Sequence, residues 1–107
     1  MSKARSTKSS GNVFADIGVP NAGEHLAKAD LVIGIAAIIR SKGLSQTAAA
    51  KLTGIAQPDL SRLMRGNFEG FSYDRLFDVL NALGENVRVV VSNAKSRKDA
   101  KLEFEFA

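Results

Sequence analysis

The sequence contains no cysteine, no tryptophan and a single histidine, His25. The absence of cysteine excludes disulfide bonds and thiolate metal sites, and one histidine leaves little material for a zinc site or a serine–histidine–aspartate triad. No nucleophile stands beside a recognisable base, and the carboxylates form no cluster along the chain. We therefore expect a protein that is not an enzyme and that holds no cofactor and no metal.

Long hydrophobic runs are also missing. The most apolar stretch, residues 31–39, is far shorter than the ~20 residues that a membrane-spanning helix requires. Residues 1–12 are polar and basic, and they lack the apolar core of a secretory signal. These features predict a soluble, cytoplasmic protein with no membrane partner, whose 107 residues suffice for one domain.

Positive charge is unevenly distributed along the chain. The net charge is +4, and residues 40–66 alone contribute five basic residues against one acidic residue. The basic residues are Arg40, Lys42, Lys51, Arg62 and Arg65, and the acidic residue is Asp59. This local excess suits an anionic partner such as nucleic acid, although an ordinary solvated surface also explains charge alone.

Apolar spacing divides the chain into a basic tail, a helical domain and a C-terminal segment. Residues 1–12 are typical of a disordered tail, and the lead-in that follows is expected to pack through Val13, Phe14 and Ile17. Residues 13–85 are expected to form the helical domain. Four helices are predicted, over 24–41, 46–53 and 57–65 and between Ser72 and Gly84. Their apolar stripes predict the core: Leu31, Ile35, Ile38, Leu60, Leu63, Met64, Leu76, Val79, Leu80 and Leu83.

The C-terminal segment, residues 86–107, has a different period. The β-branched run Asn86–Val91 predicts a strand, and the strict alternation of Leu102–Phe106 predicts a second one. The two could pair as a hairpin within the chain, although the link between them is long. Alternatively Val87–Val91 pairs with a second copy, because an exposed apolar strand invites such pairing. We favour the second arrangement, which makes this segment a dimerisation element.

The segment Leu44–Gly66 predicts two short helices around a tight turn at Gly54. Ala50 is expected where the helices cross, because a large side chain there would push them apart. Two further features mark the segment, Ser45-Gln46 at its start and Ser61-Arg62 on the second helix. A helix–glycine–helix pattern also occurs in plain helical bundles, but these features at fixed offsets favour a helix-turn-helix whose second helix enters a DNA major groove. Three apolar side chains are expected to pack beneath the turn and the second helix: Ile55, Leu60 and Leu63.

The outer face of that second helix carries the side chains expected to read bases, which are Gln57, Pro58, Ser61 and Arg62. Glutamine pairs with adenine and arginine with guanine through two hydrogen bonds each. Ser61 can reach a base edge or a phosphate, and Pro58 a thymine methyl group. Asp59 is predicted either to stabilise the helix N-terminus or to accept a hydrogen bond from cytosine.

Phosphate contacts are expected around this face. Gln46 begins the first helix of the pair and can anchor that N-terminus to a phosphate. The other phosphate candidates are Arg65, Asn67 and Lys51.

The residues of this segment resemble the helix-turn-helix of the lambda-repressor/Cro (XRE) family, through LSQ at 44–46, Ala50, Gly54-Ile55, SRL at 61–63 and Arg65-Gly66. Outside it the chain is similar to HigA-like antitoxins of type II toxin–antitoxin pairs. That likeness is carried by NVFADIG at 12–18, FSYDRL at 71–76, LNALG at 80–84 and VRVV at 87–90.

The resemblance implies a five-helix or near-five-helix DNA-binding domain, so together with the pattern of the C-terminal segment we expect a mainly α-helical, lambda-repressor-like bundle with a C-terminal β-strand or hairpin. It also implies a homodimer on a palindromic DNA operator, repression of the protein's own operon and neutralisation of a RelE-like ribonuclease toxin. Two residues depart from the family pattern: Thr53 replaces the usual leucine before the turn, and Ala56 replaces the usual serine or threonine cap. The alternatives are a module that mainly covers a partner protein and an XRE-type repressor with no toxin.

Overall fold

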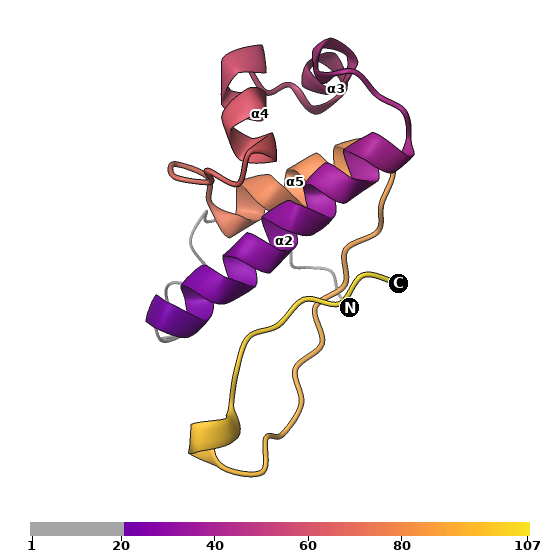
Figure 1. The fold of residues 1–107 in the computed structure, drawn as a ribbon. Coiled ribbons are helices and arrows are strands. Elements are labelled where there is room, and N and C mark those ends of the chain that lie inside the picture. The colour runs from indigo at the N-terminus through magenta and orange to yellow at the C-terminus, as the bar shows by residue number, and fades with distance from the viewer. Residues whose placement is uncertain (1–20) are drawn as a thin grey trace.

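The computed structural model describes residues 21–107 of the chain, and Figure 1 shows their course. Four α-helices follow one another as α2 (Asn21–Ser41), α3 (Gln46–Thr53), α4 (Gln57–Met64) and α5 (Tyr73–Ala82), and a 3-10 turn, η2 (Arg97–Asp99), lies in the C-terminal segment. All four expected helices are confirmed, with α2 starting at Asn21 rather than Glu24 and α4 ending at Met64 rather than Arg65. The expected tail and lead-in, including Val13, Phe14 and Ile17, lie outside the described residues.

One core joins all four helices. The long helix α2 crosses α5, while α3 and α4 lie together beside this pair (Figure 1). The expected stripes are buried as predicted, except that Ile38 and Met64 are only partly buried. The largest fully buried side chains are Leu31, Val32, Ile35, Ile39, Leu60, Leu63 and Leu76. The helical part of the predicted fold is therefore confirmed.

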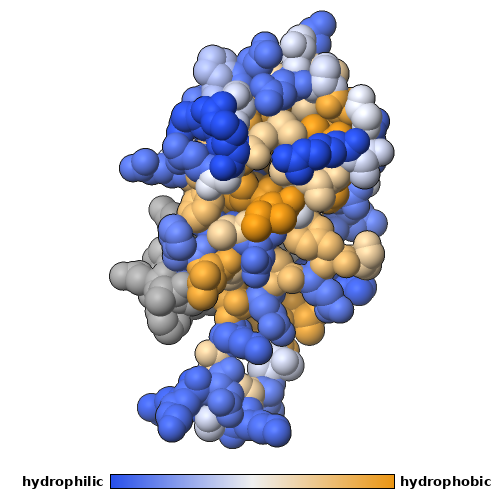
Figure 2. Space-filling view, viewed as in Figure 1, coloured by the Kyte–Doolittle hydropathy of each residue, from blue (hydrophilic) through white to orange (hydrophobic). Residues whose placement is uncertain are grey.

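The face of α2 directed away from this core carries two exposed apolar side chains among charged residues such as Asp30 and Arg40. Leu26 and Ile33, two turns apart, expose 67% and 64% of their surface. Hydrophobic residues gather along the middle of the molecule in Figure 2, while the end formed by α3 and α4 is mainly hydrophilic. No helix in the part of the chain that the structure describes is long and apolar enough to cross a bilayer.

The two predicted strands are wrong for this chain on its own. Residues 86–96 and 100–107 are free of strand structure in the described part of the chain. A strand exists only through hydrogen bonds to a neighbouring strand. The link from Ser92 to Lys101 includes η2, and it carries the chain away from the helices before the chain returns (Figure 1). A two-residue turn would have held a hairpin in register, and this long link does not.

The returning segment instead binds the helices through alternate side chains. Leu102 and Phe104 are partly buried against the core, while Glu103 and Glu105 are exposed. The Phe104 ring centroid lies 5.8 Å from that of Tyr73 and 6.1 Å from that of Phe77. The predicted alternation is thus correct for Leu102 and Phe104, whereas Phe106 is 44% exposed, and no ladder accompanies it.

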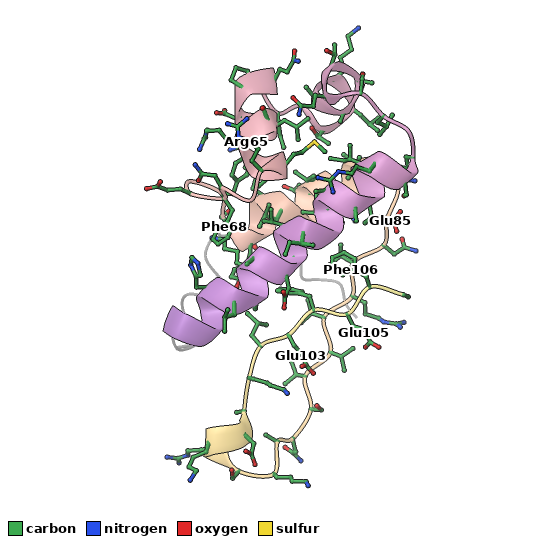
Figure 3. All side chains as sticks on the ribbon, viewed as in Figure 1. Arg65, Phe68, Glu85, Glu103, Glu105 and Phe106 are labelled. Carbon is green, nitrogen blue, oxygen red and sulfur yellow. The ribbon has the colours of Figure 1, made fainter. Side chains whose placement is uncertain are left out.

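Phe106 ends this segment against α2. Figure 3 shows its ring beside the helix, where it meets Gly34. A Cβ atom built on Gly34 would overlap the Phe106 ring, so a glycine is needed for this approach. The glycine within the helix is therefore explained by close packing.

Candidate nucleic-acid interface

A capped helix and a left-handed glycine shape the turn between α3 and α4. The Ser45 side chain caps α3 by accepting a hydrogen bond from the Ala48 N–H at 3.0 Å. Gly54 ends α3 with φ 76° and ψ 10°, and its N–H donates to the Ala50 carbonyl at 2.9 Å. Because side chains strain this left-handed conformation, glycine is the residue that suits the turn. The tight turn expected at Gly54 is confirmed.

Apolar contacts below the turn hold the two helices together. Ile55, Leu60 and Leu63 are buried as predicted, with 3%, 0% and 1% of their surface exposed. Ala49 is fully buried in the core, and Ala50, the residue expected at the crossing, is partly buried against it.

Thr53 stands where leucine is usual, and its polar side chain makes hydrogen bonds with backbone groups of the turn. Its Oγ1 donates to the Ala49 carbonyl at 2.7 Å and accepts from the Ile55 N–H at 3.4 Å. The neighbouring Leu52 is 50% exposed and does not replace the missing apolar contact. The helix-turn-helix geometry is therefore retained by hydrogen bonds at this position.

The outer face of α4 brings together most of the predicted reading residues. At 3.6 residues per turn, Pro58, Ser61, Arg62 and Arg65 lie opposite the buried Leu60 and Leu63. Gln57 begins the helix and is exposed. Figure 3 shows Arg65, which directly follows α4, in the part of the molecule remote from η2. This helix presents a polar, positively charged face that fits a major groove.

Two pairs within α4 restrain the polar side chains of this face. The Arg62 Nη2 donates to Asp59 Oδ1 at 3.0 Å, one turn earlier along the helix. The Arg65 Nη1 donates to Ser61 Oγ at 2.7 Å. Sequence reasoning missed both pairs, although their i,i+3 and i,i+4 spacings are signals from which they could have been found.

The remaining candidates surround this face. Gln46 is the first residue of α3, and both it and Lys51 are exposed. Asn67 lies beyond α4, where its N–H donates to the Arg62 carbonyl at 3.0 Å and its Oδ1 accepts from the Glu69 N–H at 3.2 Å. Asn67 therefore has a structural role in the turn after α4 besides any contact with phosphate.

The N-terminus of α4 lacks a side-chain cap. Ala56 occupies the N-cap position and makes no capping hydrogen bond, as its sequence predicts. Pro58, in the first turn, has no N–H to satisfy, which reduces the number of open donors. The helix therefore presents uncapped backbone N–H groups beside Gln57.

No chemistry other than binding is evident in the described residues. Within them no group of histidine and acidic side chains is arranged to hold a metal ion. A shallow hollow between α2 and the end of α4 is lined mainly by apolar side chains, among them Val32, Ile33 and Met64, with Arg40 and Arg65 also present. It offers no set of groups for acid–base or nucleophilic catalysis.

Comparison with known proteins places this geometry in a family. Residues 13–92 match the family model described as a helix-turn-helix domain. A solved structure named "Putative XRE Family Transcriptional Regulator" superposes with a TM-score of 0.71 at 38% sequence identity, covering 82% of this chain and 98% of that one. No curated protein matches the chain. The family consists of regulators and not of enzymes, which confirms the expectation for catalysis, and the chain belongs to the XRE family of helix-turn-helix, DNA-binding transcriptional regulators.

Proposed function

We propose that this protein is a sequence-specific repressor that binds, as a homodimer, a palindromic operator in its own promoter. The observation that carries the proposal is the outer face of α4, where Pro58, Ser61, Arg62 and Arg65 lie opposite the buried side of the helix. When α4 enters a major groove with this face toward the bases, its polar side chains reach the base edges, and base sequence is read through such contacts.

Seven of the eight predicted contact residues divide between bases and backbone. We assign base edges to the outer face of α4 and phosphates to the residues around it, because phosphate contacts fix the register and base contacts give the preference. The base set is Gln57, Pro58, Ser61 and Arg62, and the phosphate set is Gln46, Arg65 and Asn67. The eighth residue, Asp59, is paired with Arg62 and belongs to neither set.

The proposed dimer uses the extended segment after α5. Val89, Val90 and Val91 expose 56%, 76% and 91% of their surface, and no strand ladder occupies their backbone in the described part of the chain. Extended, exposed apolar backbone of this kind can add to the same segment of a second copy. Two copies related by a two-fold axis would place two α4 helices at half-sites about 34 Å apart.

The antitoxin role is the finer part of the proposal. It is supported by the sequence resemblance to HigA-like antitoxins, whose motifs fall almost entirely within the 13–92 span of the family match. The partner would be a RelE-like ribonuclease encoded next to this gene. Co-expression of the neighbouring small protein with this chain should give a stable complex and should relieve the growth arrest that the neighbour causes alone.

Two other functions remain testable beside this one. The exposed apolar residues Leu26, Ile33 and Val89–Val91 favour a module that mainly covers a partner protein. A repressor without any toxin would show operator binding and no effect on its neighbour's product. Tight binding of the neighbour with no preference for the promoter would instead favour the covering module.

The test is a binding measurement with DNA from the protein's own promoter and random DNA of equal length, each at two salt concentrations. We expect the promoter to bind more tightly at both, and both affinities to fall as salt rises because phosphate contacts release counterions. Equal affinity for promoter and random DNA would refute autorepression.

A further inference from the structure

We propose that Asp59 is a positioning residue that makes Arg62 a reader of guanine, and that it is neither a base contact nor a helix stabiliser in its own right. The inference rests on the proposed role of α4 in reading DNA. It concerns a residue whose function is ambiguous from sequence, because an acidic side chain in the first turn suits the helix N-terminus as well as a cytosine contact.

The geometry ties the carboxylate to the arginine. Asp59 Oδ1 and Arg62 Nη2 are 3.0 Å apart, and the two side chains remain 43% and 38% exposed. The guanidinium is planar, so a carboxylate that holds one nitrogen also restricts the direction of the others. Guanine needs two donors of one arginine aimed at O6 and N7 together, so this restriction favours bidentate pairing.

The charge of Asp59 also separates the roles of the two arginines. A free guanidinium is attracted to the nearest phosphate, which carries no sequence information. Beside Arg62 the Asp59 carboxylate repels phosphate oxygens and leaves the arginine for bases. Arg65 is paired with the neutral hydroxyl of Ser61 at 2.7 Å, so it keeps its full attraction for the backbone.

The experiment compares the wild-type chain with Asp59→Asn, Arg62→Ala and the double variant, using operator and random DNA over a salt series. Asp59→Asn removes the charge at nearly constant volume. We expect it to bind random DNA more tightly, with a salt dependence steeper by about one counterion. The ratio of operator to random affinity should fall roughly 5- to 150-fold, the range that one bidentate base pairing supplies.

If Asp59 acts by positioning Arg62, the effect of Asp59→Asn depends on the presence of Arg62. In the Arg62→Ala background, Asp59→Asn should change the ratio less than about 2-fold, because the residue it orients is absent. The matched control is Asp74→Asn, which removes an acidic residue from the first turn of α5 and should leave the ratio unchanged. Asp59→Glu keeps the charge but displaces it, so it should lower the ratio without strengthening random binding. This variant also provides the test if Asp59→Asn does not fold.

Each contrary result has a definite meaning. A folded Asp59→Asn variant with the wild-type ratio overturns the inference and leaves the proposed function standing. An equal effect in the presence and absence of Arg62 overturns it as well, because Asp59 then acts directly. A wild-type chain that does not prefer its operator refutes the proposed function and the inference together.

Discussion

The two arginines of α4 differ in what holds them, and this difference predicts different responses to substitution. Arg62 is paired with a carboxylate and Arg65 with a hydroxyl. Arg62→Ala should cost roughly 1–3 kcal/mol on the operator and relax the preference at one base pair. Arg65→Ala should weaken all sequences about equally and lower the salt slope by about 1. Fluorescence anisotropy with a panel of single-base operator variants measures both.

The control for these variants is Arg97→Ala, which removes the same side chain from η2 at the end of the molecule remote from α4 (Figure 1). It should leave both the base preference at the operator and the salt dependence of DNA affinity unchanged. A uniform loss of affinity for Arg62→Ala would reassign Arg62 to phosphate.

The identities of the candidate contact residues could be predicted because helical period and the position of Gly54 fix which side of α4 is buried. The arrangement of their side chains could not. The Asp59–Arg62 pair depends on rotamers, which many sequences with the same spacing would not adopt.

At the scale of elements, the uncapped start of α4 predicts a stabilising substitution. Ala56 precedes the helix in an extended conformation, with φ −59° and ψ 139°, and contributes no capping bond. Ala56→Ser supplies an oxygen for the first-turn N–H groups and should raise the free energy of unfolding by about 1 kcal/mol. Urea denaturation followed by circular dichroism measures the gain.

Ser45→Ala is the matched reverse experiment, since Ser45 already caps α3 through the Ala48 N–H. It should lower the free energy of unfolding by about the same 1 kcal/mol. A neutral Ala56→Ser together with a destabilising Ser45→Ala would mean that the start of α4 is already satisfied by other groups.

The helices were predictable from sequence and the paired strands were not, for one physical reason. A helix satisfies its backbone within a local segment, so the spacing of residues such as Leu76 and Leu80 and the caps Ser45 and Ser72 are sufficient signals. A strand needs a partner elsewhere, and the β-branched run at 86–91 does not state where that partner is. In the 102–106 segment the pattern was correct for Leu102 and Phe104, which pack against the core.

The contact between this segment and α2 predicts a non-additive pair of substitutions. Gly34→Ala alone gains helix propensity of about 1 kcal/mol, but its Cβ displaces the Phe106 ring. With Phe106→Ala present the overlap is gone, and Gly34→Ala should stabilise the protein by the full ~1 kcal/mol. The wild-type background should show a smaller gain or a loss. A double-mutant cycle of urea denaturation measures the difference, and additive effects would mean that Phe106 does not lie on Gly34 in solution.

At the scale of the whole molecule, the hydrophilic end at α3 and α4 and the apolar surfaces lie apart. Figure 2 shows blue residues over α3 and α4 and orange residues along the middle of the molecule. This separation would leave the α3 and α4 end free for DNA if a protein partner bound elsewhere. Among the exposed apolar side chains are two surfaces that would suit the proposed second copy, Leu26 with Ile33 on α2 and the valines at 89–91.

The two surfaces predict opposite results for matched charge substitutions. Val89 and Val91 lie in an extended segment with no strand ladder in the described part of the chain, whereas Leu26 and Ile33 lie on a helix whose backbone is already paired. Only the first surface offers main-chain hydrogen bonds to a copy of itself. The double variant Val89→Lys/Val91→Lys should therefore be a monomer in sedimentation equilibrium and lose roughly 10²–10⁴-fold in operator affinity as the half-sites uncouple.

Leu26→Lys/Ile33→Lys adds the same charge on the other apolar surface and should remain a dimer with near wild-type operator affinity. Because both variants gain two positive charges, any change in non-specific DNA binding is shared and cancels in the comparison. If the α2 variant dissociates while the valine variant stays dimeric, the two-fold axis lies at α2. The spacing of the two α4 helices, and with it the half-site separation of the operator, would then follow from that helix and not from the segment after α5.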